Sequence, residues 1–148
     1  MALKHLLLAA SVVLMAGQAL AEDKVHRLAL QITDDSPDKM NTVLGNATNA
    51  TKYYASKGEK VEIRVVAYSA GVTMLRTDKS PVLERLKTFS ESMPNVTFEA
   101  CNNTLEGIAK RENKKVEEIP LLPGAKIVPA GVVELIDLNE QGWTIVRP

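Results

Sequence analysis

Few residue types in this 148-residue sequence could do chemistry, and the most reactive is a single cysteine, Cys101. A lone thiol cannot form a disulfide within its own chain. It lies in the stretch "FEACNNTLEG", between a pattern typical of a strand and one typical of a short helix. Unpaired N–H groups at a helix start favour the thiolate, which predicts a reactive nucleophile. The alternative stays open that Cys101 is a buried, structural residue, as most free cysteines are.

The other candidates for catalysis and metal binding are sparse. Of the two histidines, His26 begins the first predicted strand, so we expect it at the edge opposite Cys101 and predict no Cys-His dyad or Ser-His-Asp triad. Zinc lacks its preferred ligands, and the single glycine of "YSAGVTML" falls short of a dinucleotide motif. We therefore predict no metal and no cofactor. Asp34 and Asp35 could hold a cation in a hydrolase, although a solvated turn is the more common role for such a pair.

Strand-like and helix-like segments alternate along the chain, which predicts a single α/β domain with a mainly parallel sheet of about five strands. Expected helices begin at Ser36-Pro37 and end before Gly58, begin at Ser80-Pro81, and follow an Asn103 cap. The expected strands cover residues 25–33, 59–68, 96–100, 126–131 and 143–146, and the last helix is "VVELIDLNEQ".

In a parallel sheet, ligands bind where the strands end at their carboxyl edge. Cys101 lies at this edge, after the third strand. The second strand leads to Gly71 and the fourth to Ala130 and Gly131, and we expect these three residues to shape a pocket. Asn102 and Asn103 follow the thiol directly, and we expect them to orient or cap a bound substrate.

The N-terminal segment has the pattern of a secretory signal. One basic residue, Lys4, precedes an apolar run, and Ala19-Leu20-Ala21 offers the small residues that signal peptidase reads. We predict cleavage after Ala21, a mature domain of residues 22–148, and a periplasmic or secreted location without a membrane anchor. The mature net charge would be −1, because Lys4 is the only acidic or basic residue lost apart from His5. This charge and the lack of a basic stripe argue against nucleic-acid binding.

Three segments in order carry a resemblance to a known family: "IRVVAYSAGV", "FEACNNTL" and "LLPGAKIVPAGVVELIDLNEQGWTIVRP". They resemble the DsrE/DsrF-like family, particularly its small exported single-domain members, and the similarity covers nearly all of residues 25–148. The resemblance implies a three-layer α/β/α fold with flavodoxin- or Rossmann-like layering, and assembly into homotrimers or homohexamers. It also implies a cysteine after the third strand that carries sulfur as a persulfide, the position of Cys101.

The segment after Cys101 departs from the sulfur-relay members of that family. Those proteins have small residues and a downstream basic pair there, whereas this chain has Asn102, Asn103 and Thr104. Their cytoplasmic partners are therefore not implied. Two functions follow as hypotheses: an exported sulfur carrier or transferase exchanging sulfane sulfur with a donor or acceptor, and a non-catalytic oligomeric module that binds a small ligand and keeps a structural cysteine.

Overall fold

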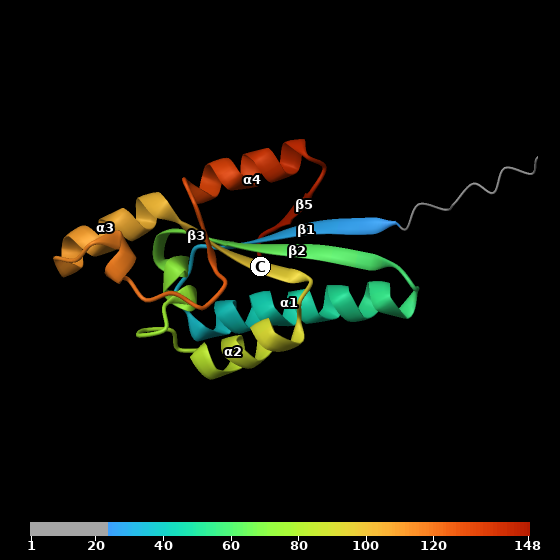
Figure 1. Ribbon diagram of the computed structural model, residues 1–148. Coiled ribbons are helices and arrows are strands. Elements are labelled where there is room, and N and C mark those ends of the chain that lie inside the picture. The colour runs from blue at the N-terminus through green and yellow to red at the C-terminus, as the bar shows by residue number, and fades with distance from the viewer. Residues whose placement is uncertain (1–23) are drawn as a thin grey trace, which may run out of the picture.

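The computed structural model describes residues 24–148, so the proposed signal segment and its cleavage after Ala21 lie outside the described residues. One five-stranded sheet runs through the molecule in the order β4-β3-β2-β1-β5, and every pair of neighbouring strands is parallel (Figure 1). The strands are β1 (Val25–Ile32), β2 (Lys60–Ala67), β3 (Val96–Cys101), β4 (Lys126–Val128) and β5 (Thr144–Val146).

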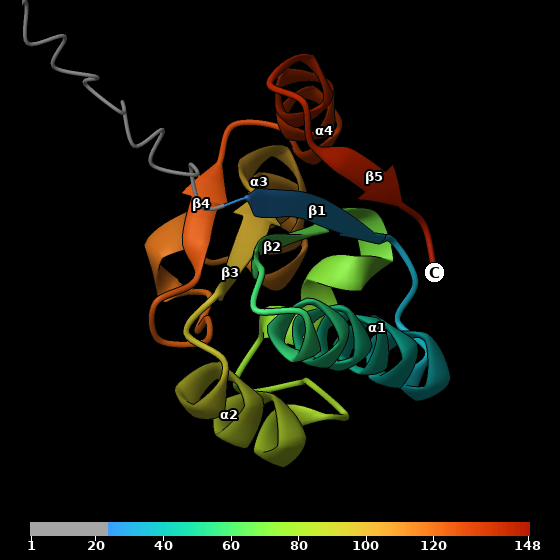
Figure 2. The same cartoon turned by 90° about the vertical axis from the view of Figure 1, so that its right-hand side faces the viewer.

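Helices cover both faces of this sheet. The helical segments are α1 (Pro37–Ser56), the 3-10 helix η1 (Ser69–Leu75), α2 (Leu83–Ser92), α3 (Asn102–Glu112), the 3-10 helix η2 (Val116–Glu118) and α4 (Gly131–Glu140). Figure 2 shows α1 and α2 below the sheet and α4 above it, and in Figure 1 α3 lies beyond the strand ends. The predicted fold class, a single α/β domain with a parallel sheet of about five strands, is confirmed.

The two faces of the sheet bury very different amounts of apolar surface. Residues such as Leu30 and Val65 face the main core, where α1 contributes Met40 and Leu44. The opposite face carries a small cluster, in which α4 and the segment after it cover the sheet with Leu135, Leu138 and Trp143. Both faces are buried in the middle strands, which explains the nearly continuous apolar run of β2.

The predicted limits of α1 agree with the structure, although its start is held differently from the expected side-chain cap. Ser36 is the N-cap, but its side chain makes no capping hydrogen bond. Instead, Asp34 Oδ1 accepts a hydrogen bond from the Ser36 backbone N–H at 2.7 Å. Asp34 therefore shapes the turn between β1 and α1. After α1 ends at Ser56, Gly58 takes a positive φ of 72°, a conformation that glycine adopts without strain.

The predicted start of α2 at Ser80-Pro81 was wrong by two residues. The helix begins at Leu83, with Val82 as its N-cap. The Ser80 backbone N–H donates to the Arg76 carbonyl at 2.9 Å, closing a turn that leads out of η1. Pro81 therefore belongs to the connection between this turn and the helix.

Gly71 fastens η1 to the end of β1. A Cβ atom at this position would lie 2.2 Å from the carbonyl oxygen of Ile32 and 2.9 Å from the backbone nitrogen of Thr33. Such distances are far below van der Waals contact, so no side chain fits between the two backbones. The glycine predicted to shape a pocket is thus a packing residue that fixes the position of η1.

We predict that Gly71→Ala lowers the free energy of unfolding by about 3 kcal/mol, because the added methyl group must push two backbone segments apart. Gly45→Ala is the matched control. Gly45 lies within α1 with nothing within 4 Å of an added Cβ, so alanine should stabilise the helix by up to about 1 kcal/mol. Urea denaturation of both variants measures the difference. Equal stability of Gly71→Ala and the wild type would contradict the tight packing of η1 on β1.

Candidate functional site

Cys101 is both the last residue of β3 and the N-cap of α3. Its backbone is extended, with φ −69° and ψ 118°, and it pairs with Val128 of β4. The helix starts at the next residue, so the prediction that Asn103 is the cap was wrong. Because no residue separates strand from helix, Asn103 already lies in the first helical turn, and the thiol is closer to the helix start than expected.

Burial and nearby hydrogen-bond donors act in opposite directions on the pKa of Cys101. The residue is only 5% exposed, and this burial favours the neutral thiol. Opposing it are the Thr104 hydroxyl and the backbone N–H groups of Gly131, Thr104 and Asn103. Together these donors outweigh burial and hold the pKa of Cys101 below the ordinary value of a cysteine. The pKa of Cys101 is thus lowered in the direction that a position at a helix start predicts.

The donors come from two helices that begin next to each other. Asn103 and Thr104 belong to the first turn of α3, and Gly131 is the first residue of α4, with Ala130 as its N-cap. The Asn103 N–H also donates to the Pro129 carbonyl at 3.4 Å, which ties the two helix starts together. Positive ends of two helix dipoles therefore point toward one sulfur atom.

Gly131 can occupy its position only because it lacks a side chain. A Cβ atom there would lie 2.8 Å from Cβ of Tyr68, the residue that follows β2. Close packing against Tyr68 brings the Gly131 N–H toward Cys101. Ala130 and Gly131, predicted to shape a pocket, instead form the start of α4 beside the thiol.

The Thr104 hydroxyl links the sulfur to η1. Its oxygen accepts a hydrogen bond from the backbone N–H of Ser69 at 3.0 Å, which leaves its hydrogen for Cys101. Ser69 has a φ of 52°, a left-handed conformation that costs a non-glycine residue about 1 kcal/mol or more. The strained turn after β2 therefore helps to orient a donor toward the thiol.

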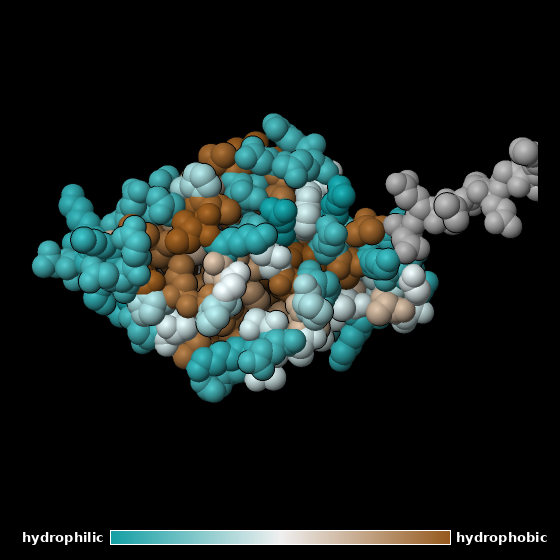
Figure 3. All heavy atoms as spheres, in the orientation of Figure 1, coloured by the Kyte–Doolittle hydropathy of each residue, from teal (hydrophilic) through white to brown (hydrophobic). Residues whose placement is uncertain are grey.

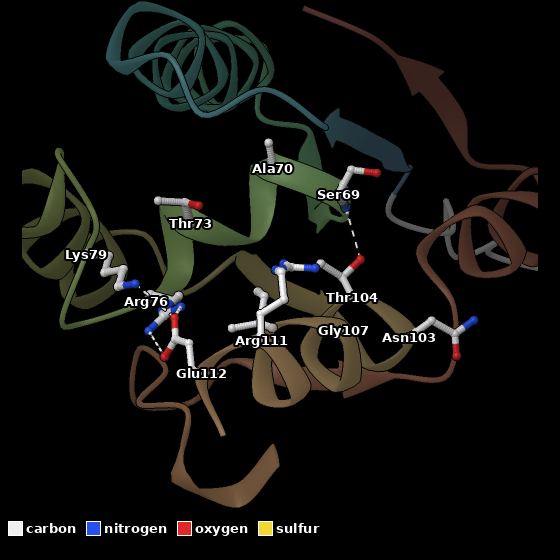
Figure 4. A pocket seen from close by; sticks show the side chains of 11 residues that line it. Ser69, Ala70, Thr73, Arg76, Lys79, Asn103, Thr104, Gly107, Arg111 and Glu112 are labelled. Carbon is white, nitrogen blue, oxygen red and sulfur yellow. Dashed lines mark hydrogen bonds and ion pairs between the residues drawn. The ribbon is translucent and has the colours of Figure 1, made fainter. Parts of the chain in front are cut away.

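A pocket of about 560 Å³ opens between η1 and α3, next to the groups that surround Cys101 (Figure 4). Polar and charged groups dominate its walls. The lining residues include Ser69, Thr73, Arg76, Asn103, Thr104 and Arg111. Cys101 is not one of them, and Asn103 and Thr104 are the residues that both line the pocket and act on the Cys101 thiol.

Two of the three cations of this pocket are neutralised by neighbouring carboxylates. Arg76 is buried and forms ion pairs with Asp78 at 2.7 Å and with Glu112 at 2.6 Å. Lys79 reaches the same Glu112 carboxylate at 2.9 Å. Hydrogen bonds from Arg76 and then from Lys79 hold the pKa of Glu112 well below its usual range. This network closes the far end of the pocket, leaving Arg111 as the third cation.

Only one residue predicted to bind substrate lines the pocket, namely Asn103. The Asn102 side chain turns away and donates to Glu106 Oε1 at 2.7 Å along α3. Sequence reasoning missed Thr104 and Arg111 as pocket residues. The spacing of these residues could have identified them, because positions 104, 107, 108 and 111 recur at helical periodicity and share one face of α3.

A buried carboxylate lies two residues before the thiol. Glu99 is 1% exposed, and Arg64 donates to its Oε1 at 3.1 Å and to Glu134 of α4 at 3.0 Å. Burial first, and then the nearby Glu134 charge, raise the pKa of Glu99. The Arg64 guanidinium also lies 5.0 Å from the ring centroid of Trp143. These contacts attach α4 to the sheet, and with it the Gly131 N–H that faces the sulfur.

The other candidates from the sequence lie elsewhere. His26, at the amino end of β1, pairs with Glu59 at 2.5 Å and stacks on Tyr54, remote from the strand end that carries Cys101. No group of three or more histidine, cysteine, aspartate or glutamate residues comes together within residues 24–148 to hold a metal. None of the helices in this part of the chain is long and apolar enough to cross a membrane.

Comparisons with known proteins support the fold class. No family model matches the sequence, and no curated protein matches it significantly. Among solved structures, the chain is similar to the protein of unknown function MTH1491 from Methanobacterium thermoautotrophicum. The TM-score is 0.67 at 29% identity, and the similarity covers 83% of this chain and 99% of the other.

We predict that Thr104→Val raises the pKa of Cys101, because it removes the hydroxyl that donates to the sulfur. At neutral pH, alkylation by iodoacetamide should slow by about three- to tenfold, the change expected from losing one hydrogen bond of about 1 kcal/mol. The measurement is the alkylation rate between pH 5 and 10. Thr73→Val, in the same pocket but outside the sulfur's donors, is the matched control and should keep the wild-type profile. An unchanged profile in Thr104→Val would show that the hydroxyl does not act on the thiol.

Proposed function

We propose that this chain is an exported sulfur-handling protein in which Cys101 holds sulfane sulfur as a persulfide. The observation that carries this proposal is the placement of Cys101 at the end of β3 and the start of α3, beside the start of α4, where nearby N–H groups and the Thr104 hydroxyl lower the pKa of Cys101 despite its burial. A thiol used only for packing has no need of such donors, whereas a thiolate nucleophile depends on them. The resemblance to the DsrE/DsrF-like family supports the same chemistry at the same position of the fold.

The proposed reaction transfers a sulfur atom without net oxidation. The Cys101 thiolate attacks the outer sulfur of a donor persulfide, R–S–SH, and a new S–S bond forms as the donor's S–S bond breaks. The donor leaves as the thiolate R–S⁻, and Cys101 becomes Cys–S–SH. In the second half of the cycle, an acceptor thiolate attacks the outer sulfur and releases the Cys101 thiolate. With a single cysteine in the chain, the sulfur must leave to another molecule.

The donors around Cys101 have a function in both halves of this cycle. They stabilise the thiolate before it attacks, and they stabilise it again as the leaving group when the acceptor removes the sulfur. The donor molecule would approach through the pocket, past the wall formed by Asn103 and Thr104. Because Cys101 is buried, this wall must shift for the reaction to occur.

The second candidate is a non-catalytic module that binds a small ligand in the same pocket. One observation favours it: the pocket is well formed, while the sulfur is almost completely buried and does not line it. In this case Cys101 would be a structural residue between two helix starts. Reactivity of the native thiol distinguishes the two candidates.

Export and self-association complete the proposal. The sequence of residues 1–21 supports export to the periplasm or beyond. For self-association, the outer face of α4 exposes Val132, Val133 and Ile136, each close to half exposed. Figure 3 shows hydrophobic side chains at the top of the molecule, where Figure 1 places α4. An exposed apolar helix face suits contact with another copy of the chain.

We predict that the mature protein forms a trimer or hexamer and that Ile136→Lys shifts it toward monomer, since a charge in an apolar interface is costly. Light scattering at micromolar concentration measures the mass. Val25→Lys is the control, because Val25 is also an exposed apolar residue but lies at the opposite end of the sheet from the α4 start. A monomeric wild type would refute the assembly.

We predict that Cys101→Ser abolishes persulfide loading while leaving the fold intact. Serine replaces one atom and is itself a favoured N-cap, so α3 should remain stable. The measurement is mass spectrometry of native wild type and variant after incubation with a low-molecular-weight persulfide, with circular dichroism to check folding. The wild type should gain the mass of one sulfur atom. If the wild type gains none, and its thiol alkylates only after denaturation, Cys101 is structural and the ligand-binding module takes its place.

A further inference from the structure

Arg111 differs from the other cations of the pocket in having no partner. Arg76 and Lys79 both bind Glu112, but Arg111 makes no ion pair or hydrogen bond to any residue among 24–148. An exposed arginine on the outer surface of a helix often lacks a partner, yet this one lines a pocket. Its charge is therefore available to a ligand.

The Arg111 side chain lies back along α3, into the pocket. One guanidinium nitrogen, Nη1, would be 3.4 Å from a Cβ atom on Gly107, which places the guanidinium beside Gly107, one turn back along the helix. In Figure 4 the side chain points from α3 into the space between this helix and η1. The guanidinium therefore lies on the side of Glu112 nearer to Thr104 and the thiol.

The groups around this guanidinium are those that bind an anion and a polar organic molecule. Thr73, Asn103 and Thr104 offer hydroxyl and amide groups, and the only acidic lining residue, Glu112, is already engaged by Arg76 and Lys79. A planar guanidinium matches a carboxylate with two parallel hydrogen bonds. The volume of about 560 Å³ lies within the range that holds small organic ligands, and an inorganic anion would fill only part of it.

We propose that this pocket binds the carboxylate of a low-molecular-weight thiol persulfide, with Arg111 as the residue that selects for the negative charge. This inference rests on the proposed function, since it names the class of sulfur donor or acceptor that Cys101 would meet. A carboxylate held by Arg111 directs the sulfur end of the same molecule toward the first turn of α3. Arg111 is thus a specificity residue and does not touch the reacting sulfur.

Binding is tested in the full mature chain carrying Cys101→Ser, so that no sulfur transfer is needed. The probe is S-methylglutathione, which carries carboxylates and no reactive sulfur, and calorimetry measures its dissociation constant. We expect Arg111→Ala to weaken binding at least about tenfold. Lys110→Ala, which removes a neighbouring exposed cation that does not line the pocket, should leave the affinity unchanged. The dimethyl ester of the probe should bind weakly to every variant.

Thiosulfate is titrated in parallel to distinguish an inorganic source of the anion. If thiosulfate binds as tightly as the tripeptide with the same dependence on Arg111, the organic class is overturned. If Arg111→Ala and Lys110→Ala weaken tripeptide binding equally, or no probe binds, the pocket assignment is overturned.

Failure of this inference is distinguishable from failure of the proposed function. Tripeptide binding that depends on Arg111, together with a wild-type thiol that takes up no sulfur, would refute the carrier and leave the pocket assignment standing. Normal sulfur loading with no tripeptide binding would refute the pocket assignment and leave the carrier standing.

Discussion

The common register of the parallel strands is the constraint on which the site depends. Ile32 of β1 pairs with Ala67 of β2, Ala67 pairs with Ala100 of β3, and Cys101 pairs with Val128 of β4. Four strands therefore end at one level, and every connection that leaves them must turn there. Because β3 leads directly into α3 and β4 leads into α4 after two residues, the free N–H groups of both helix starts lie at the same edge of the sheet.

Burial and hydrogen bonding compete at the Cys101 sulfur, and the outcome depends on how many donors can approach it. A single helix start would offer the N–H groups of Asn103 and Thr104, set against a burial that favours the neutral thiol. The structure adds the Thr104 hydroxyl and the Gly131 N–H. Each addition needs a local feature, namely the left-handed Ser69 for the hydroxyl and the missing side chain of Gly131 for its N–H. A lowered pKa at a buried thiol is therefore a property of three connections acting together.

The sequence was sufficient to predict the sheet, its parallel order of connections and the position of Cys101 at a strand end. These features follow from local periodicity and from residues with fixed backbone preferences, such as Pro37 and Gly58. The sequence did not predict that Cys101 is the N-cap of α3, because the pairing of β3 with β4 extends one residue beyond the expected strand. The sequence also did not predict the walls of the pocket. They depend on which face of α3 packs toward η1, and this is determined by tertiary contacts rather than by the sequence of either helix alone.

The sheet face that α4 covers buries little apolar surface, and this explains why Arg64 forms ion pairs with Glu99 and Glu134 there. Only a small apolar cluster holds α4 against the sheet, so hydrophobic burial alone offers little to fix the orientation of this helix. Arg64 bridges Glu99 of β3 and Glu134 of α4, and the buried carboxylate would be costly without it. Since Glu134 lies one turn from Gly131, the bridge sets the direction of the helix start as well as its distance. The buried charges of this domain thus help to position the Gly131 N–H group, one of the groups that lower the pKa of Cys101.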